Sequence, residues 1–156
     1  MEDFFRFYLA AVTNELVEKK KLYTAFKHYY VIRKSDTDDD VLLEEIVRYA
    51  KYFSMLYYDN LDNPREELRD YRMIASMMLA PFMLAFCELF YHDHKITENQ
   101  FYGVMKIVNT YLIRRTFAGM DTSRVSRSFP VYLKRVEEIA NDNGFADIED
   151  LSLIHI

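Results

Sequence analysis

The stretch MIASMMLAPFMLAFC, residues 73–87, is the longest run without a charged side chain in this 156-residue sequence. It is shorter than the roughly 20 apolar residues that a membrane-spanning helix needs, so it predicts a helix in the core of a folded domain. Pro81 lies inside the run, and a proline ring clashes with the carbonyl four residues earlier. We therefore expect a kink at Pro81, or two helices that meet near residues 78–80, with neighbours packed on several sides.

The sequence on both sides of this stretch repeats its apolar residues at helical spacing. A short aromatic helix is expected over 3–12, a second helix from Leu16 onward, and a last one up to about residue 140. The apolar stripes of the expected helices consist of Leu16, Tyr23, Phe26 and Tyr30; of Leu42, Ile46, Tyr49, Phe53 and Leu56; and of Phe101, Val104, Met105, Val108, Tyr111 and Leu112.

Residues that favour helix ends separate these stripes. Thr97 and Gln100 have the spacing of a capping box, and Asn63-Pro64 predicts an N-cap followed by proline at the first helical position. Gly119 is placed as the glycine that follows a helix C-terminus. The sequence therefore predicts an all-α fold, a multi-helix bundle of about five to seven helices over residues 1–145.

Composition excludes several other classes of protein. Only 3 Gly and 3 Pro leave few tight turns for a sandwich of short strands, and 51% hydrophobic residues exclude a disordered polar segment. The single cysteine, Cys87, excludes a disulfide framework. The first residues lack a basic secretory signal, so we expect a cytoplasmic protein without a membrane segment.

Two groups of side chains resemble metal sites. Asp36, Asp38 and Asp40 have the spacing of the first ligands of a calcium-binding loop. Val41 and Val47, however, occupy the positions at which that loop needs Gly and Glu. The three acids are therefore interpreted as a cluster at a helix N-terminus. Glu88 and His92 are four residues apart, whereas His94 lies beyond the expected helix end, so no third ligand completes a set. We expect no metal site, no cofactor and no catalytic residue, and Cys87 is expected in the core.

The C-terminal part of the chain is basic. Residues 103–135 contain seven Lys or Arg and one Asp, although the whole chain has a net charge of −5. Four of these cations cluster opposite the apolar face of the last expected helix: Arg124, Arg127, Lys134 and Arg135. Such a stripe can neutralise phosphates, as in a helix-turn-helix, or it can be a solvated face that pairs with acidic neighbours.

Arg114 and Arg115 precede Gly119 at the end of the preceding helix. Arg115 continues the buried stripe, so we expect it to point inward. Two roles follow from that position. It can hydrogen-bond the last carbonyls of the helix and a carboxylate of another helix, or it can reach a phosphate or a neighbouring domain.

Three segments together resemble the helical region of GmrSD-like proteins, which are modification-dependent (type IV) restriction endonucleases and related phage-defence proteins. The segments are LYTAFK at 22–27, APFMLA at 80–85 and YLIRRTFAG at 111–119, followed by Thr122 and residues 126–129. The residues that carry the resemblance are Leu22, Tyr23, Phe26, Lys27, Pro81, Arg114, Arg115 and Gly119. It extends over about residues 4–140.

The resemblance implies a connector between an N-terminal nucleotide-hydrolysing domain of the ParB type and a C-terminal His-Asn-His-type nuclease. The motifs of those domains are absent from this sequence, so no enzymatic activity is expected of the chain itself. Its implied partners are the flanking sensor and nuclease domains, and DNA through the basic hairpin. The tail, 146–156, is set apart, because 151–156 (LSLIHI) resembles translated sequencing-adapter sequence. The alternative is a free-standing helical module that binds a protein partner.

Overall fold

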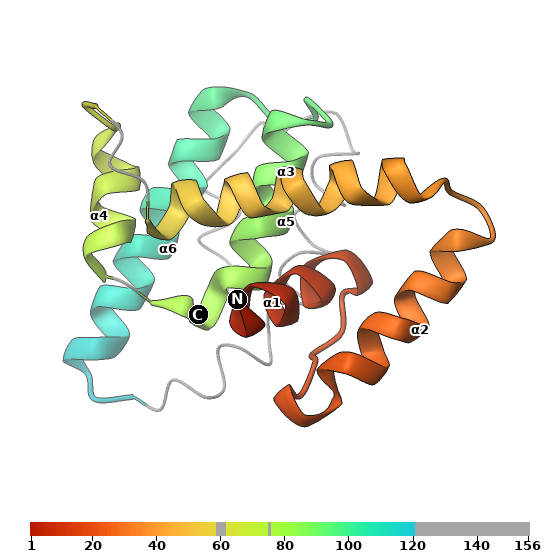
Figure 1. Ribbon diagram of the computed structural model, residues 1–156. Helices are drawn as coiled ribbons and strands as arrows, with labels where there is room; N and C mark the ends of the chain where they lie inside the picture. The colour runs from red at the N-terminus through yellow and green to blue at the C-terminus, as the bar shows by residue number, and fades with distance from the viewer. Residues whose placement is uncertain (59–61, 75, 121–156) are drawn as a thin grey trace.

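The computed structural model describes residues 1–58, 62–74 and 76–120, and within these ranges the chain is an all-α bundle of six α-helices (Figure 1). The helices and two short 3₁₀ turns follow in the order α1 (Glu2–Thr13), η1 (Lys19–Lys21), α2 (Leu22–Lys34), α3 (Asp39–Tyr57), α4 (Glu66–Ile74), η2 (Met77–Leu79), α5 (Ala80–Tyr91) and α6 (Glu98–Phe117). The predicted fold class is therefore confirmed.

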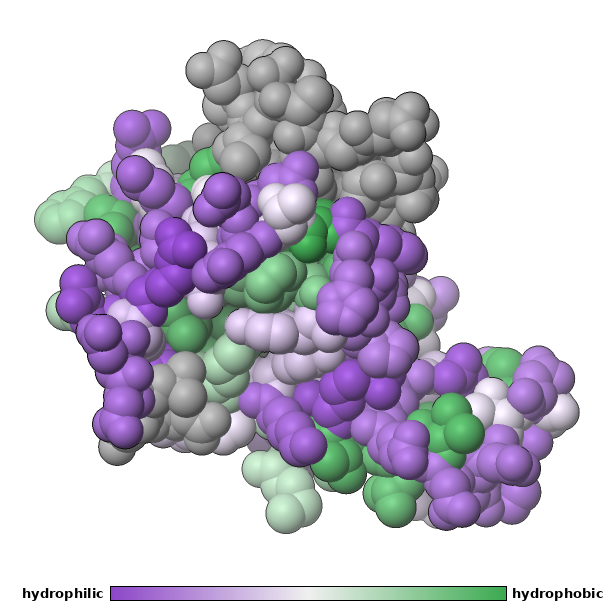
Figure 2. Space-filling view, turned by 90° about the horizontal axis from the view of Figure 1, so that it is seen from above, coloured by the Kyte–Doolittle hydropathy of each residue, from purple (hydrophilic) through white to green (hydrophobic). Residues whose placement is uncertain are grey.

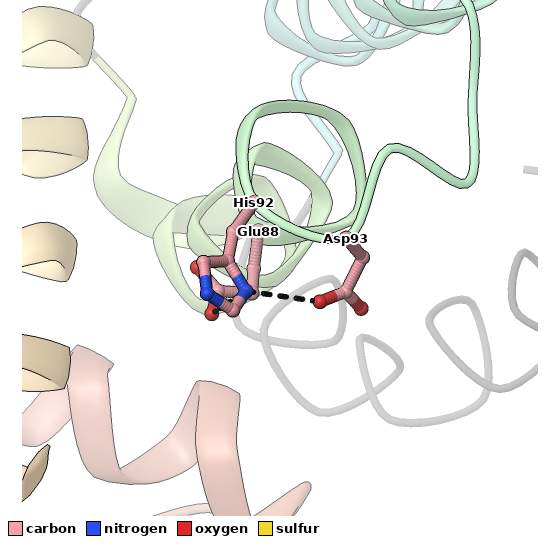
Figure 3. Close-up of side chains that lie close together, drawn as sticks. All are labelled: Glu88, His92 and Asp93. Carbon is pink, nitrogen blue, oxygen red and sulfur yellow. Dashed lines mark hydrogen bonds and ion pairs between the residues drawn. The ribbon is translucent and has the colours of Figure 1, made fainter.

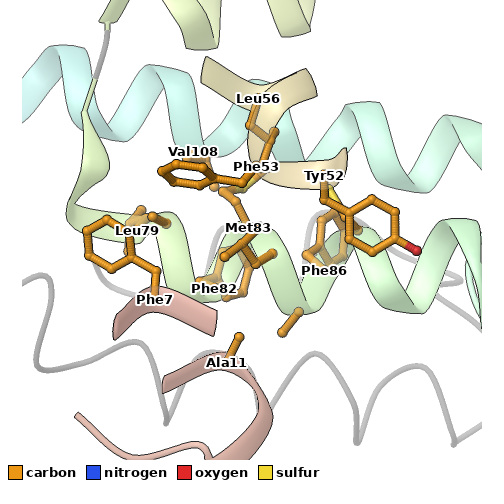
Figure 4. Close-up of a cluster of buried hydrophobic side chains, with 14 of the residues drawn as sticks. Phe7, Ala11, Tyr52, Phe53, Leu56, Leu79, Phe82, Met83, Phe86 and Val108 are labelled. Carbon is orange, nitrogen blue, oxygen red and sulfur yellow. The ribbon is translucent and has the colours of Figure 1, made fainter. Parts of the chain in front are cut away.

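Helix α5, which contains the second half of the uncharged stretch, is the centre of the bundle. It is buried nearly all round because it packs against α1, α3 and α6. Figure 4 shows the resulting core, where Phe7 of α1, Phe53 of α3 and Val108 of α6 surround Met83. Burying side chains of this size contributes about 1.5–3 kcal/mol each, so the core supplies most of the stability of the fold.

Phenylalanine rings join α5 to α6. Phe82 and Phe86 stack with 5.6 Å between ring centres, Phe86 and Phe101 with 5.2 Å, and Phe90 and Phe101 with 4.7 Å. The rings are nearly parallel, and such aromatic pairs stabilise beyond the area that they bury. The stack fixes the start of α6 against the middle of α5.

Pro81 lies in the first turn of α5, where the missing N–H removes no helical hydrogen bond. Helix α4 ends at Ile74, and Ser76 caps the short turn η2 by accepting a hydrogen bond from the Met78 N–H. The stretch does form two helices, as one of the two predicted alternatives states, but α4 already ends at Ile74, before residues 78–80. No single helix of the described ranges has the length and apolar character to cross a membrane, and α4 joined to η2 and α5 passes that test only across a bend of 106°.

The two longest predicted stripes are confirmed. Leu42, Tyr49, Phe53 and Leu56 of α3 are buried and Ile46 is half-buried against the core, while all six stripe residues of α6 are buried. The capping box is present too: the Thr97 side chain accepts from the Gln100 N–H, and the Gln100 side chain accepts from the Thr97 N–H at 2.8 Å. The acids before α3 occupy its N-terminus, with Asp38 at the cap position and Asp39 and Asp40 in the first turn.

The predicted start of the second helix at Leu16 is wrong. Asn14 has a left-handed backbone (φ 56°), and Glu18 is extended, so the chain is not helical until the turn η1 and the start of α2 at Leu22. As a result Leu16 and Tyr23 are 50% and 80% exposed instead of buried, while Phe26 packs on the core.

The start of α4 also differs from the prediction. Asn63 is left-handed (φ 54°), which leaves Pro64 outside the helix, and the Arg65 carbonyl accepts the first helical hydrogen bond from Arg69. Helix α4 therefore begins at Glu66. The last expected helix and the tail, 146–156, lie outside the described residues.

Candidate functional site

The motif YLIRRTFAG is the C-terminal end of α6. Gly119 has a left-handed backbone (φ 62°), its N–H donates to the Thr116 carbonyl at 3.2 Å, and the Met120 N–H donates to the Arg115 carbonyl at 3.2 Å. This pair of hydrogen bonds is a Schellman motif, and it satisfies carbonyls that the helix end would otherwise leave open. The predicted role of Gly119 after the helix is confirmed.

Tyr111 and Leu112 at the start of this motif are buried, but several side chains after them face solvent. Arg114 is exposed, and Phe117 is 89% exposed, beside half-exposed Ile113 and Met120. The end of α6 thus exposes a large apolar side chain close to an arginine.

Arg115 is half-buried, and its guanidinium lies 5.5 Å from the centre of the Tyr111 ring. It therefore follows the buried stripe only in part, and its contact with Tyr111 is within α6 itself. Arg114, on the outer side, is the more accessible of the two. The four cations that the sequence places after this motif, Arg124, Arg127, Lys134 and Arg135, lie outside the described residues.

The motif LYTAFK forms the first two turns of α2. Leu22 and Phe26 are half-buried against the core, and the Phe26 ring meets Phe5 of α1 edge-on at 5.5 Å. Tyr23 and Lys27 are exposed. One side of the motif therefore attaches α2 to the bundle, and the other presents a tyrosine and a lysine to solvent.

A polar cluster around Glu45 was not predicted from the sequence. The Glu45 carboxylate of α3 accepts hydrogen bonds from Tyr8 Oη at 2.6 Å and Tyr29 Oη at 2.8 Å, and from Arg33 Nη2 at 2.8 Å. Burial raises the pKa of Tyr29 to about 12, and burial together with Glu45 raises the pKa of Tyr8 further. Both hydroxyls therefore stay protonated as donors, and one carboxylate ties α1, α2 and α3 together.

A second ion pair joins α3 to the central helix. Arg48 donates to Glu88 through Nε, at 3.0 Å from Oε2, and through Nη2, at 2.7 Å from Oε1. The two side chains are 27% and 16% exposed. A two-pronged contact between planar groups is the strongest arrangement for such a pair, so it fixes the orientation of α3 on α5.

Glu88, His92 and Asp93 form the one group of three ligand-type side chains found in residues 1–58, 62–74 and 76–120 (Figure 3). His92 Nδ1 lies 3.3 Å from Glu88 Oε1 and 3.2 Å from Asp93 Oδ1. Arg48 neutralises Glu88, and Lys95 lies 3.2 Å from Asp93. Burial opposes ionisation of Asp93, but hydrogen bonds from His92 and Lys95 lower its pKa below the usual range. Each carboxylate thus has a protein cation already, and the arrangement favours an ion-pair chain over a metal site.

Asp93 was not predicted, because the candidate ligands in the sequence were Glu88, His92 and His94. His94 adopts a left-handed backbone (φ 53°) just beyond α5, outside the group. Cys87 is fully buried, and burial raises the pKa of its thiol. The expectation that Cys87 is a core residue is confirmed.

Comparison with known proteins does not place the chain in a family: no family model, no curated protein and no solved structure matches it.

Proposed function

We propose that the chain is the helical connector of a GmrSD-like DNA restriction and phage-defence protein, holding a nucleotide-sensing domain against a nuclease domain. The observation that carries this proposal is the position of the most specific motif. YLIRRTFAG ends α6 with Arg114 and an 89% exposed Phe117 on the surface. A side chain of that kind is suited to an interface between domains, and the basic residues 124–135 that follow in sequence provide charge for DNA.

The interior of the bundle supports a mechanical role. Glu45 and Glu88, the two carboxylates with the most hydrogen bonds in the described residues, are used to join helices. The polar contacts extend from α1 through α3 to α5, and the aromatic stack continues to α6. These contacts support transmission of force through the four helices as one unit, with α2 attached at their edge.

The test begins with the genomic sequence on both sides of the reading frame. A nucleotide-motif domain upstream and a His-Asn-His-type domain downstream would support the proposal. A natural start at Met1 and a stop after Ile156 would contradict it, and the alternative of a free-standing partner-binding module would then be preferred.

In a full-length parent, Phe117→Ser and Arg114→Glu should lower nucleotide-dependent DNA cleavage without unfolding the bundle. Tyr58→Ser, at a 65% exposed site directly after the end of α3, is the matched control. Neutralising Arg124, Arg127, Lys134 and Arg135 should weaken DNA binding and flatten its dependence on salt. Unchanged cleavage by Phe117→Ser and Arg114→Glu would contradict the domain interface at the end of α6. Unchanged DNA binding after the four cations are neutralised would contradict the DNA contact.

The alternative is favoured by one observation. A cleft of about 410 Å³ lies between α1 and η2, and most of its lining is apolar, including Phe7, Leu16 and Met78. A partner that inserts an apolar side chain would fill it. Pull-down experiments with this chain alone would test the alternative, because a connector needs its flanking domains and a free-standing module does not.

A further inference from the structure

The segment of η1 and α2 is the most basic part of the described structure. Residues 19–34 contain six Lys or Arg and no Asp or Glu. Helix α2 lies at the edge of the bundle and contains no fully buried residue. Figure 1 shows it at the right, away from α4 and α6, and Figure 2 shows the same side as a largely hydrophilic lobe.

Tyrosines and lysines alternate along one side of α2. Tyr23, Lys27, Tyr30 and Lys34 follow each other at intervals of three or four residues, so they lie on one face of the helix. At the C-terminal half, Lys34 and Tyr30 both contact Asp39. At the N-terminal half, Tyr23 is 80% exposed and Lys27 has no ion pair with the described residues.

A cleft of about 370 Å³ lies beside Tyr23, between α1 and the start of α2. Its apolar lining comes from Phe5, Leu22 and Phe26, and its charged lining comes from Lys19, Lys20 and Glu2. A flat apolar group can therefore lie against aromatic and aliphatic side chains while ammonium groups remain at its edge.

The lysines of this surface make few ion pairs with the described residues. Lys19 pairs with Glu2 at 3.1 Å, with both side chains more than half exposed, and such surface pairs are weak because water competes for both charges. Lys20, like Lys27, makes no ion pair with the described residues. An incoming anion thus competes with one weak pair at Lys19 and with none at Lys20 and Lys27.

We propose that Lys19, Lys20, Tyr23 and Lys27, together with the adjacent cleft, bind single-stranded nucleic acid. The lysines contact phosphates, and a base stacks on the exposed ring of Tyr23. Cations that track the backbone next to an aromatic ring on which bases stack are the combination that sequence-tolerant single-strand binding requires. The carboxylates of an acidic peptide could pair with the same lysines as phosphates do, but the peptide would leave the exposed Tyr23 ring without a stacking partner.

This surface is independent of the proposed function, because it uses α2 and not α6 or the basic residues that follow it. Either proposal can fail without the other. Different readouts separate them: the α2 variants are tested by binding of a single strand to this chain, and the α6 variants by nucleotide-dependent DNA cleavage in a full-length parent.

The experiment measures binding of the full chain to a fluorescently labelled oligothymidine by anisotropy over a range of salt concentrations. Three phosphate contacts predict a log–log salt slope of about −2, and K20Q/K27Q should reduce it to about −0.7. Y23A should weaken binding roughly tenfold with the slope unchanged, and Y23F should restore it, because the ring and not the hydroxyl stacks. Lys51→Gln and Tyr58→Ala change exposed residues on another element and are the matched controls.

An abasic strand with the same number of phosphates separates base stacking from charge alone. We expect it to bind wild-type protein about as weakly as oligothymidine binds Y23A. Equal binding of both strands, or equal competition by a polyglutamate peptide, would overturn the proposal in favour of a general site for polyanions. Absence of binding at low salt, or unchanged binding by K20Q/K27Q and Y23A while circular dichroism shows an intact fold, would overturn it outright.

Discussion

The pair of Arg48 and Glu88 provides the sharpest test of how this bundle is held together. It joins the long helix α3 to the buried helix α5 by two hydrogen bonds of 2.7 and 3.0 Å. With the side chains 27% and 16% exposed, water can replace only part of the contact if one partner is removed. Arg48→Met removes the cation and leaves the carboxylate in place.

Breaking a fully buried pair costs about 3–5 kcal/mol, mostly because one charge remains without its partner. Here partial exposure lets water and His92, which lies 3.3 Å from Glu88, compensate in part. We therefore expect Arg48→Met to lower the free energy of unfolding by about 2–3 kcal/mol. Removing both charges, in R48M/E88M, should return it to within about 1 kcal/mol of the wild type, because no charge is left buried.

Urea denaturation of the wild type, both single variants and the double variant, followed by circular dichroism, gives the coupling free energy of the pair. We expect about 2 kcal/mol of coupling. The exposed pair of Lys21 and Glu18 is the control and should couple by less than about 1 kcal/mol. If the double variant loses as much free energy of unfolding as the two single variants together, the destabilisation does not come from a charge left buried without its partner, and this explanation is refuted.

Further predictions concern helix ends, packing and pH. Gly119→Ala should destabilise by about 1 kcal/mol through its left-handed backbone, since no atom of the described residues lies within 4 Å of the added methyl group, and Gly119→Asn should cost less. Phe86→Ala should cost about 3–5 kcal/mol in urea denaturation because it removes the middle of the aromatic stack, and a cost below about 1 kcal/mol would contradict that packing. Thr97→Ala should cost about 1 kcal/mol through the lost capping box, with Thr97→Ser close to wild type. The pKa of Tyr8 and of Tyr29 is raised in the folded state, so both hydroxyls contribute fully to the free energy of unfolding below about pH 10. This contribution is lost as the pH rises above about 10, so tyrosinate absorbance should increase together with unfolding.

The parts of the fold that the sequence predicts are those with local causes. The α3 and α6 stripes repeat over several turns, Thr97 and Gln100 interact across one turn, and Pro81 restricts its own neighbourhood. These effects do not depend on the rest of the molecule, so they are visible in the order of residues alone.

The parts that were wrong or missed depend on contacts between distant segments. Leu16 fits a helical stripe, but the left-handed Asn14 and the lysine-rich turn that follows delay α2 to Leu22. The partners of Glu45 come from α1 and α2, and those of Glu88 from α3 and the end of α5. A signal did exist: Glu45 and Arg48 lie one turn apart beside the buried Tyr49, a place where charged side chains need partners.

The attachment of α2 has a consequence for how the protein opens. This helix buries no residue completely, and Glu45 holds it through Tyr29 and Arg33 rather than through a large apolar face. Local opening of a helix costs less free energy when few apolar contacts are lost. Amide hydrogens of α2 should therefore exchange with solvent well before those of α5, and a protease should cut near the irregular residues 14–18 while the remaining helices stay folded. We therefore expect the described residues to behave as a slowly exchanging core, with α2 as an arm that opens more readily.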